Sequence, residues 1–300
     1  MNPDSNRIYL GDCLDLMRSW PDTFVQTCVT SPPYWGLRDY KTKGQMGIET
    51  SPIKYVEKIV AVFREVRRIL RDDGTLWLNL GDSYCTNPGN GRAERLVESN
   101  PHRSGMDKSR CGLKPKDLVG IPWRVAFALQ DDGWYLRSDI IWAKPNPMPE
   151  SVMDRPTKSH EYLFLLAKSE HYFYDTNAIK EAASYGVPNS PESIKSPHGQ
   201  GYTRRAQKVP AGWDQGHGSH DKLVGRYKTD KQRGHGRRHD GFNARWDAME
   251  KIDQCTGMRN RRSVWTVATA PFSEAHFATF PPELIKPCIL AGSKGKRYCA

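Results

Sequence analysis

The chain has 300 residues, 37% of them hydrophobic, and is therefore long enough to bury a sizeable core without a disulfide scaffold. Its net charge of +11 at pH 7 favours a polyanionic partner. No run of about 18 apolar residues occurs, and residues 1–14 lack a signal-peptide pattern. These features exclude a membrane-spanning protein and predict a cytoplasmic one.

Strand and helix signals alternate along residues 1–183, which we predict to form the catalytic region. The elements expected there are a strand at 7–10, a helix at 14–20, a strand at 24–30, a helix at 52–70, a strand at 75–80, a helix at 118–130, and strands at 134–142 and 162–168. The helix at 52 opens with Ser51 as its cap and Pro52 in its first turn, and Asp73-Gly74 is expected to end it. This alternation predicts an α/β fold, with a largely parallel sheet and helices on both faces.

Residues 184–262 differ in composition. We predict that they form a basic, partly irregular insertion that recognises the target sequence of a nucleic acid. From Lys195 to Arg262 there are 16 Lys and Arg residues against 7 Asp and Glu residues, with aromatic residues between them. A charged run is usually a solvated face, but its position between two parts of one fold favours DNA binding. The expected DNA-binding residues are Arg204, Arg205, Arg237 and Arg238 in this insertion, with Arg38 in an earlier loop. Residues 263–300 return to strand and helix patterns, and we expect them to rejoin the catalytic domain.

The cysteines and histidines predict neither a metal site nor a disulfide framework. The seven cysteines, at 13, 28, 85, 111, 255, 288 and 299, contain no Cys-x-x-Cys pair, which is typical of reduced thiols. The five histidines of the insertion lack regular ligand spacing. Cys288 lies in an apolar helical stretch and is expected to be a buried structural thiol instead of a nucleophile.

The segment Ser31-Pro32-Pro33-Tyr34 follows the strand at 24–30, and the carboxyl ends of strands carry the ligand sites of such sheets. Two consecutive prolines stiffen the loop and remove two N–H donors, which leaves an edge rich in acceptors. The Ser31 hydroxyl and the Pro32 carbonyl would hold the two hydrogens of an exocyclic amino group, whose nitrogen could then take a methyl group. The Tyr34 ring would stack on a base rotated out of the duplex.

Four segments of the chain resemble, in order, the motifs of site-specific DNA amino-methyltransferases, which use S-adenosylmethionine to modify N4 of cytosine or N6 of adenine. The segments are residues 9–14, 31–34, 76–84 and 276–284. The resemblance implies a Rossmann-like, S-adenosylmethionine-dependent methyltransferase sheet with its catalytic motif before its cofactor motif. It also implies a set of cofactor-binding residues, namely Asp12, Ser31, Phe277, Phe280, Pro281 and Leu284. Asp12 could equally cap the helix at 14–20. The family's Gly-rich cofactor segment does not occur before Ala300, which indicates a chain cut short at its C-terminus.

The serine that leads the catalytic motif favours cytosine N4 as the target, because aspartate is typical of adenine enzymes of this family. Adenine N6 is the alternative, and a DNA-binding remnant without catalysis is a second. A methyltransferase for RNA or a protein amide is disfavoured, since its motif usually begins with asparagine. The expected partner is double-stranded DNA, and a cognate restriction endonuclease is a further candidate.

Overall fold

The structure is a computed structural model that describes residues 7–85, 111–182, 258–270 and 279–293. The contacts within the chain divide it into two units, one formed by residues 1–179 and 261–300, the other by residues 180–260. In the second unit the described residues form an antiparallel pair of short strands, β5 (Glu181–Ala182) and β6 (Met258–Arg259). The Arg259 guanidinium pairs with the Glu181 carboxylate at 2.9 Å.

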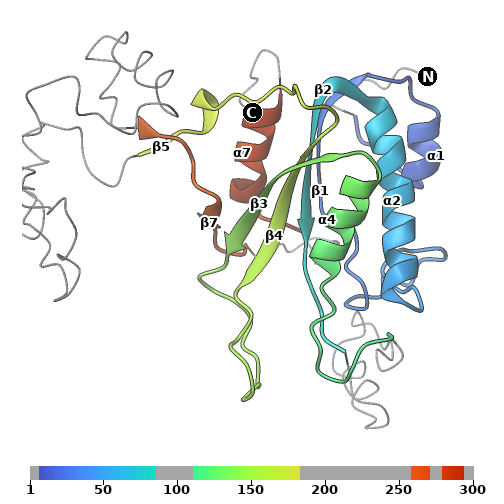
Figure 1. The fold of residues 1–300 in the computed structure, drawn as a ribbon, viewed down its shortest axis with the longest axis vertical. Coiled ribbons are helices and arrows are strands. Elements are labelled where there is room, and N and C mark those ends of the chain that lie inside the picture. The colour runs from blue at the N-terminus through green and yellow to red at the C-terminus, as the bar shows by residue number, and fades with distance from the viewer. Residues whose placement is uncertain (1–6, 86–110, 183–257, 271–278, 294–300) are drawn as a thin grey trace, which may run out of the picture. The chain divides into compact units, whose positions relative to one another are not determined.

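The first unit contains a five-stranded sheet with the strand order β1-β2-β4-β3-β7 (Figure 1). Its strands are β1 (Val25–Thr30), β2 (Leu70–Leu80), β3 (Tyr135–Ala143), β4 (His160–Ala167) and β7 (Val264–Thr266). The expected α/β fold is confirmed, and the sheet is largely parallel, as expected: β1, β2, β3 and β7 run in one direction. The sequence interpretation missed that β4 runs antiparallel to both of its neighbours, β2 and β3. Residues 144–159 join β3 to β4 without an intervening helix, and parallel neighbours would need such a crossover.

The helices lie on both faces of this sheet, as expected. Figure 1 shows α1 (Cys13–Arg18), α2 (Pro52–Ile69) and α4 (Ile121–Asp131) on one face and α7 (Pro282–Gly292) on the other. The Ser51 side chain accepts from the Lys54 N–H and starts α2, as the sequence predicts. However, α2 leads into β2 at Leu70, so the break expected at residues 73–74 is absent. Among the described helices, none is long and apolar enough to cross a membrane.

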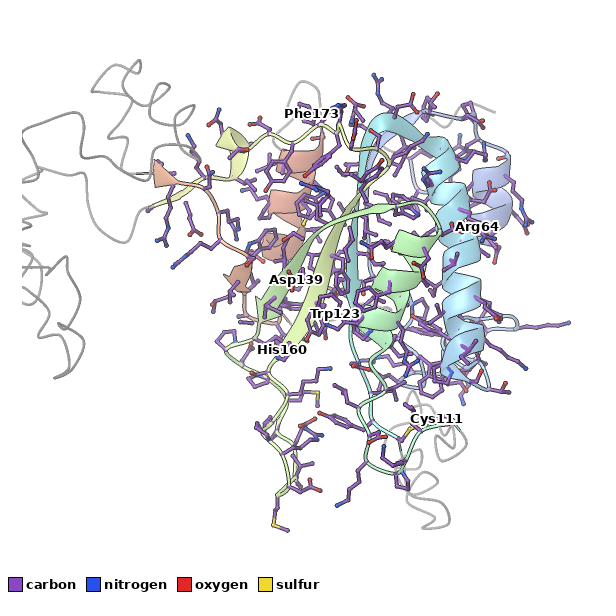
Figure 2. All side chains as sticks on the ribbon, in the orientation of Figure 1. Arg64, Cys111, Trp123, Asp139, His160 and Phe173 are labelled. Carbon is purple, nitrogen blue, oxygen red and sulfur yellow. A yellow bond between two sulfur atoms is a disulfide. The ribbon has the colours of Figure 1, made fainter. Side chains whose placement is uncertain are left out.

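Strand alternation divides the core between the two faces. Leu76, Leu78 and Leu80 of β2 join the core beneath α2 and α4, whereas Trp77 joins the core beneath α7. Cys288 on α7 has no exposed surface, which confirms the predicted buried thiol. Side chains of α4 fill the first core, and Figure 2 labels one of them, Trp123, whose ring meets the rings of Tyr162 and Phe164 edge to face.

The N-terminal residues 7–10 do not form the expected strand. Ile8 and Leu10 are 95% and 100% exposed, and the Tyr9 ring packs edge-on against Trp20 with 5.5 Å between centroids. A β-strand needs a hydrogen-bonded neighbour, and no described strand pairs with this segment.

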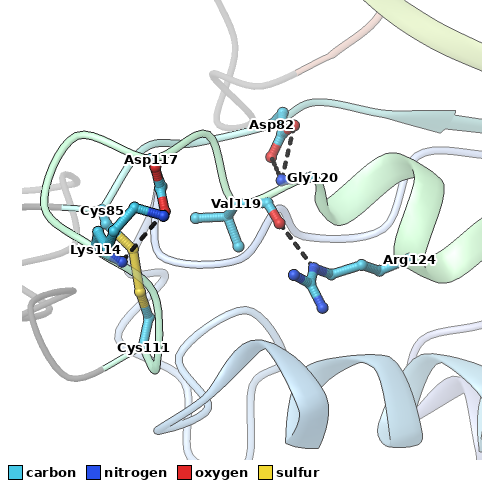
Figure 3. Close-up of a disulfide and its surroundings, with 8 residues drawn as sticks. All are labelled: Asp82, Cys85, Cys111, Lys114, Asp117, Val119, Gly120 and Arg124. Atoms are coloured by element: carbon cyan, nitrogen blue, oxygen red, sulfur yellow. Dashed lines mark hydrogen bonds and ion pairs between the residues drawn. A yellow bond between two sulfur atoms is a disulfide. The ribbon is translucent and has the colours of Figure 1, made fainter.

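Cys85 and Cys111 form a disulfide, so the prediction of reduced thiols is wrong for this pair (Figure 3). The segment that begins at Cys111 returns to the end of β2, where the Cys85 N–H donates to the Asp117 carbonyl at 2.9 Å. Tyr84 and Leu118 form a bridge beside it. The two cysteines are 26 residues apart, and only this tertiary pairing brings them together.

Candidate active site

The Ser31–Tyr34 elbow begins directly after β1 and is braced from two sides. Its four residues are half-buried, so part of each stays accessible. The Tyr55 hydroxyl, from α2, donates to the Pro33 carbonyl at 2.9 Å. On another side the backbone approaches at Gly47, which has a φ of +96°, and a Cβ there would lie 3.0 Å from the Tyr34 carbonyl oxygen. These contacts and the two prolines hold the elbow in one conformation.

The residue after the elbow, Trp35, anchors the loop that follows. Trp35 is 1% exposed, and its indole N–H donates to the Glu49 carbonyl at 2.9 Å. The Glu49 carboxylate accepts from the Gly47 N–H at 2.9 Å and pairs with Lys58 at 3.0 Å. Trp35 therefore packs the loop and is not available to a ligand.

Tyr34 lies across the end of the sheet, with its ring against Gly81 at the end of β2. A Cβ on Gly81 would be only 2.5 Å from the ring carbon Cε2, so glycine leaves room for the ring. The phenolic oxygen is 3.2 Å from Ser31 Oγ, 3.0 Å from Asn79 Oδ1 and 2.7 Å from Glu161 Oε2. Burial of the phenol and the negative charge of Glu161 raise the pKa of Tyr34 well above its ordinary value.

Glu161 and Asn79 are site residues that the sequence interpretation missed. The Glu161 carboxylate forms an ion pair with the Lys144 ammonium, and each side chain is 17% exposed. Lys144 also lies over the Trp142 ring, 4.2 Å from its centroid. The sequence did hold a signal for both, because each is a polar residue in an otherwise apolar strand. Asn79 lies within Leu76–Leu80, and Glu161 lies at the start of β4.

The residues expected to bind the cofactor have three different positions in the structure: one caps a helix, two lie in the core, and one lies half-exposed beside the core. The Asp12 carboxylate accepts from the N–H groups of Leu14 and Asp15, which confirms its role as the cap of α1. Pro281 is buried and Leu284 has no exposed surface, so both build the core at the start of α7. Phe280 packs against that core while half-exposed. Figure 1 shows this end of α7 toward the carboxyl end of β1, where Ser31 lies. Phe277 lies outside the described residues.

Asp82 follows β2 and acts as a remote cap of α4. Its carboxylate accepts from the N–H groups of Gly120 and Ile121, both at 3.0 Å, and Figure 3 draws the contact with Gly120. Gly120 has no side chain to cap the helix, so this contact satisfies the first donors of α4 and joins it to the sheet.

Of the residues expected at DNA, only Arg38 is described. It is half-buried in the loop after the elbow, where its carbonyl accepts from Gln45 Nε2 at 3.4 Å. Arg204, Arg205, Arg237 and Arg238 lie outside the described residues, so their DNA contacts stay predictions.

Comparison with known proteins decides what kind of enzyme carries this elbow. The family model described as DNA methylase, N6_N4_Mtase, matches residues 25–299, which include the elbow and every strand of the large sheet. The chain belongs to this DNA methylase family. The match confirms the resemblance on which the sequence interpretation rested.

Curated relatives of this DNA methylase are similar over almost the whole chain. The chain is 44% identical over 294 residues to the type II methyltransferase M.XycI of Xanthomonas campestris pv. cyanopsidis. This alignment covers 97% of this chain and 74% of that protein. The chain is also 40% identical over 293 residues to M.SmaI of Serratia marcescens, covering 98% of this chain and 77% of that protein.

Among solved structures, the methylase is similar to the PvuII DNA methyltransferase (cytosine-N4-specific). The TM-score is 0.50 at 14% identity, over 95% of this chain and 70% of that one. This likeness supports the Rossmann-like fold assignment.

Proposed function

We propose that this DNA methylase transfers a methyl group to the exocyclic N4 of cytosine at a specific site in double-stranded DNA. The supporting observation is the elbow itself, a braced and half-exposed row of acceptors at the carboxyl end of β1. The Ser31 hydroxyl leads this row, which favours cytosine over adenine within the family. M.XycI and M.SmaI are named type II methyltransferases, which supports action within a restriction-modification system alongside a cognate endonuclease.

The chemistry required of the elbow is to make a poor nucleophile reactive. The lone pair of an exocyclic amino nitrogen is delocalised into the base ring, and it becomes available when the two N–H groups are held out of the ring plane. The Ser31 hydroxyl and the Pro32 carbonyl accept these two hydrogens. Held in this way, the nitrogen could accept the methyl group that the donor would supply, and the amino group would release one proton to solvent.

S-adenosylmethionine, the methyl donor of the family, supplies an electrophilic methyl group on a sulfonium centre. The described residues fit a donor site at this edge of the sheet in part. Ser31 and Phe280 keep accessible surface at the same end of the sheet, while Leu284 supports the start of α7 from the core. In this proposal Phe280 contacts the donor, and Pro281 and Leu284 hold Phe280 in place.

The test compares Ser31→Ala with the wild-type sequence, both as the full-length protein. Methyl incorporation into duplex DNA should fall about 100-fold in kcat, because one acceptor of the amino hydrogens is lost, while donor affinity stays within about twofold. Ser169→Ala is the matched control, since Ser169 follows β4 at the opposite end of the sheet and should leave kcat unchanged. Digestion of the methylated DNA to nucleosides distinguishes the two targets. N4-methylcytosine is the expected product, whereas N6-methyladenine would show that adenine is the substrate. If the wild-type protein binds DNA but transfers no methyl group, the chain is instead a DNA-binding remnant of a methyltransferase.

A further inference from the structure

A chain of polar side chains runs behind the elbow and connects Ser31 to a half-buried ion pair. Ser31 contacts Tyr34, Tyr34 contacts Glu161, and Glu161 contacts Lys144. The first two contacts measure 3.2 and 2.7 Å between oxygen atoms. The four residues come from the end of β1, from the start of β4 and from the loop after β3, so the tertiary fold assembles the chain.

The direction of these hydrogen bonds follows from the groups that face the Tyr34 oxygen. The Asn79 amide is oriented by its own N–H, which donates to the Tyr162 carbonyl at 3.0 Å, so the amide oxygen faces Tyr34. Glu161 is a carboxylate in its ion pair with Lys144 and has lone pairs only. Both neighbours are therefore acceptors, and the single phenolic proton of Tyr34 must point toward them.

The Tyr34 proton is retained through the working pH range. Burial and the nearby Glu161 charge both raise the pKa of this phenol, so it stays a donor to Glu161. Its lone pairs are then left for Ser31, whose hydroxyl donates to them.

A serine hydroxyl has one hydrogen and two acceptor lone pairs. When its hydrogen points to Tyr34, both lone pairs stay available to accept, and Ser31 is half-buried, so part of it remains accessible. An amino group on a base presents only hydrogens, so it needs an acceptor in this orientation. We propose that Glu161, held by Lys144, is a positioning residue that fixes the Ser31 hydroxyl as an acceptor through Tyr34.

This inference rests on the proposed function, because it assumes that Ser31 meets the amino group. It adds that the orientation of Ser31 is set from a strand that the catalytic motif does not include. It also gives Tyr34 a second task, since the hydroxyl polarises Ser31 while the ring is left for base stacking.

Two conservative variants test the inference in the full-length protein. Tyr34→Phe keeps the ring and removes the oxygen, so the Ser31 hydroxyl is free to rotate. Glu161→Gln keeps the shape and places an N–H₂ group within reach of Tyr34, which can reverse the hydrogen bonds. Each should lower kcat about tenfold, the loss expected for one hydrogen bond, with KM for DNA within about twofold. A merely structural loss would instead raise KM or lower the unfolding temperature.

The double variant and a matched control make the pathway specific. Once Tyr34→Phe has cut the connection, adding Glu161→Gln should lower kcat no further. Glu150→Gln is the control, because Glu150 also pairs with a cation, Arg155 at 2.7 Å, yet stands outside this chain of bonds. It should leave kcat unchanged.

The outcomes separate this inference from the proposed function. If Ser31→Ala keeps the unmodified kcat, the role of Ser31 in transfer is wrong and the inference fails with it. If Ser31→Ala is impaired but Glu161→Gln and Tyr34→Phe are not, only the positioning role is overturned. If Glu161→Gln does not fold, Tyr34→Phe alone decides, and an unchanged kcat in that variant overturns the inference.

Discussion

Gly81→Ala tests whether the position of the Tyr34 ring controls methyl transfer. The added Cβ would lie 2.5 Å from Tyr34 Cε2 and 2.7 Å from Cδ2, whereas ordinary contact begins at 3.4 Å. The ring must therefore retreat by about 0.9 Å, the difference between 3.4 and 2.5 Å. Gly81 is not among the glycines with positive φ, so alanine suits the backbone and the effect comes from the ring.

The shift is large on the scale of the Tyr34 contacts. Its hydroxyl lies 2.7 Å from Glu161 and 3.0 Å from Asn79, and a displacement of about 1 Å lengthens such bonds beyond useful range. Misplacement by about 1 Å can reduce a catalytic rate about 100-fold, so we expect kcat for DNA methylation to fall by that factor. Overpacking should also lower the free energy of unfolding by about 1–3 kcal/mol.

The assay measures incorporation of labelled methyl groups at saturating DNA, together with urea unfolding. In a Tyr34→Ala background the ring is gone, so Gly81→Ala should then have no further effect on kcat. The reasoning would be refuted if Gly81→Ala kept the wild-type kcat. It would also be refuted if Gly81→Ala lowered kcat by the same factor in the wild-type and Tyr34→Ala backgrounds.

Three further predictions concern the scaffold. Asp82→Ala removes the remote cap of α4, and urea unfolding should show a loss of about 1–2 kcal/mol; no loss would mean that solvent replaces the cap. Leu284→Ala leaves a cavity beneath α7 and should cost about 2–5 kcal/mol, against about 0.5 kcal/mol for Ile289→Ala, which is 45% exposed on the same helix; equal losses would contradict the packing described. Burial raises the pKa of Cys28 to about 12, so at pH 8 its thiol is almost wholly protonated, and peptide mapping after brief alkylation should find the exposed Cys13 modified first.

The sequence alone was sufficient for features that depend on nearby residues. The apolar stripe and the Ser51 cap predicted α2, because both act within a few turns of one helix. The double proline after a β-rich run located the elbow for the same reason. Cys288 was correctly placed in the core from the apolar residues beside it.

The tertiary structure decided every feature that joins distant parts of the chain. The antiparallel direction of β4 depends on how residues 144–159 connect the sheet, and the Cys85–Cys111 disulfide depends on a loop returning to β2. The contact between Tyr34 and Glu161 spans 127 positions, so no local pattern predicts it. Sequence periodicity records which face of an element is buried. The partner of a buried polar group is set instead by the packing of separate elements, and this packing brings the Ser31–Tyr34 elbow together with the ion pair of Glu161 and Lys144.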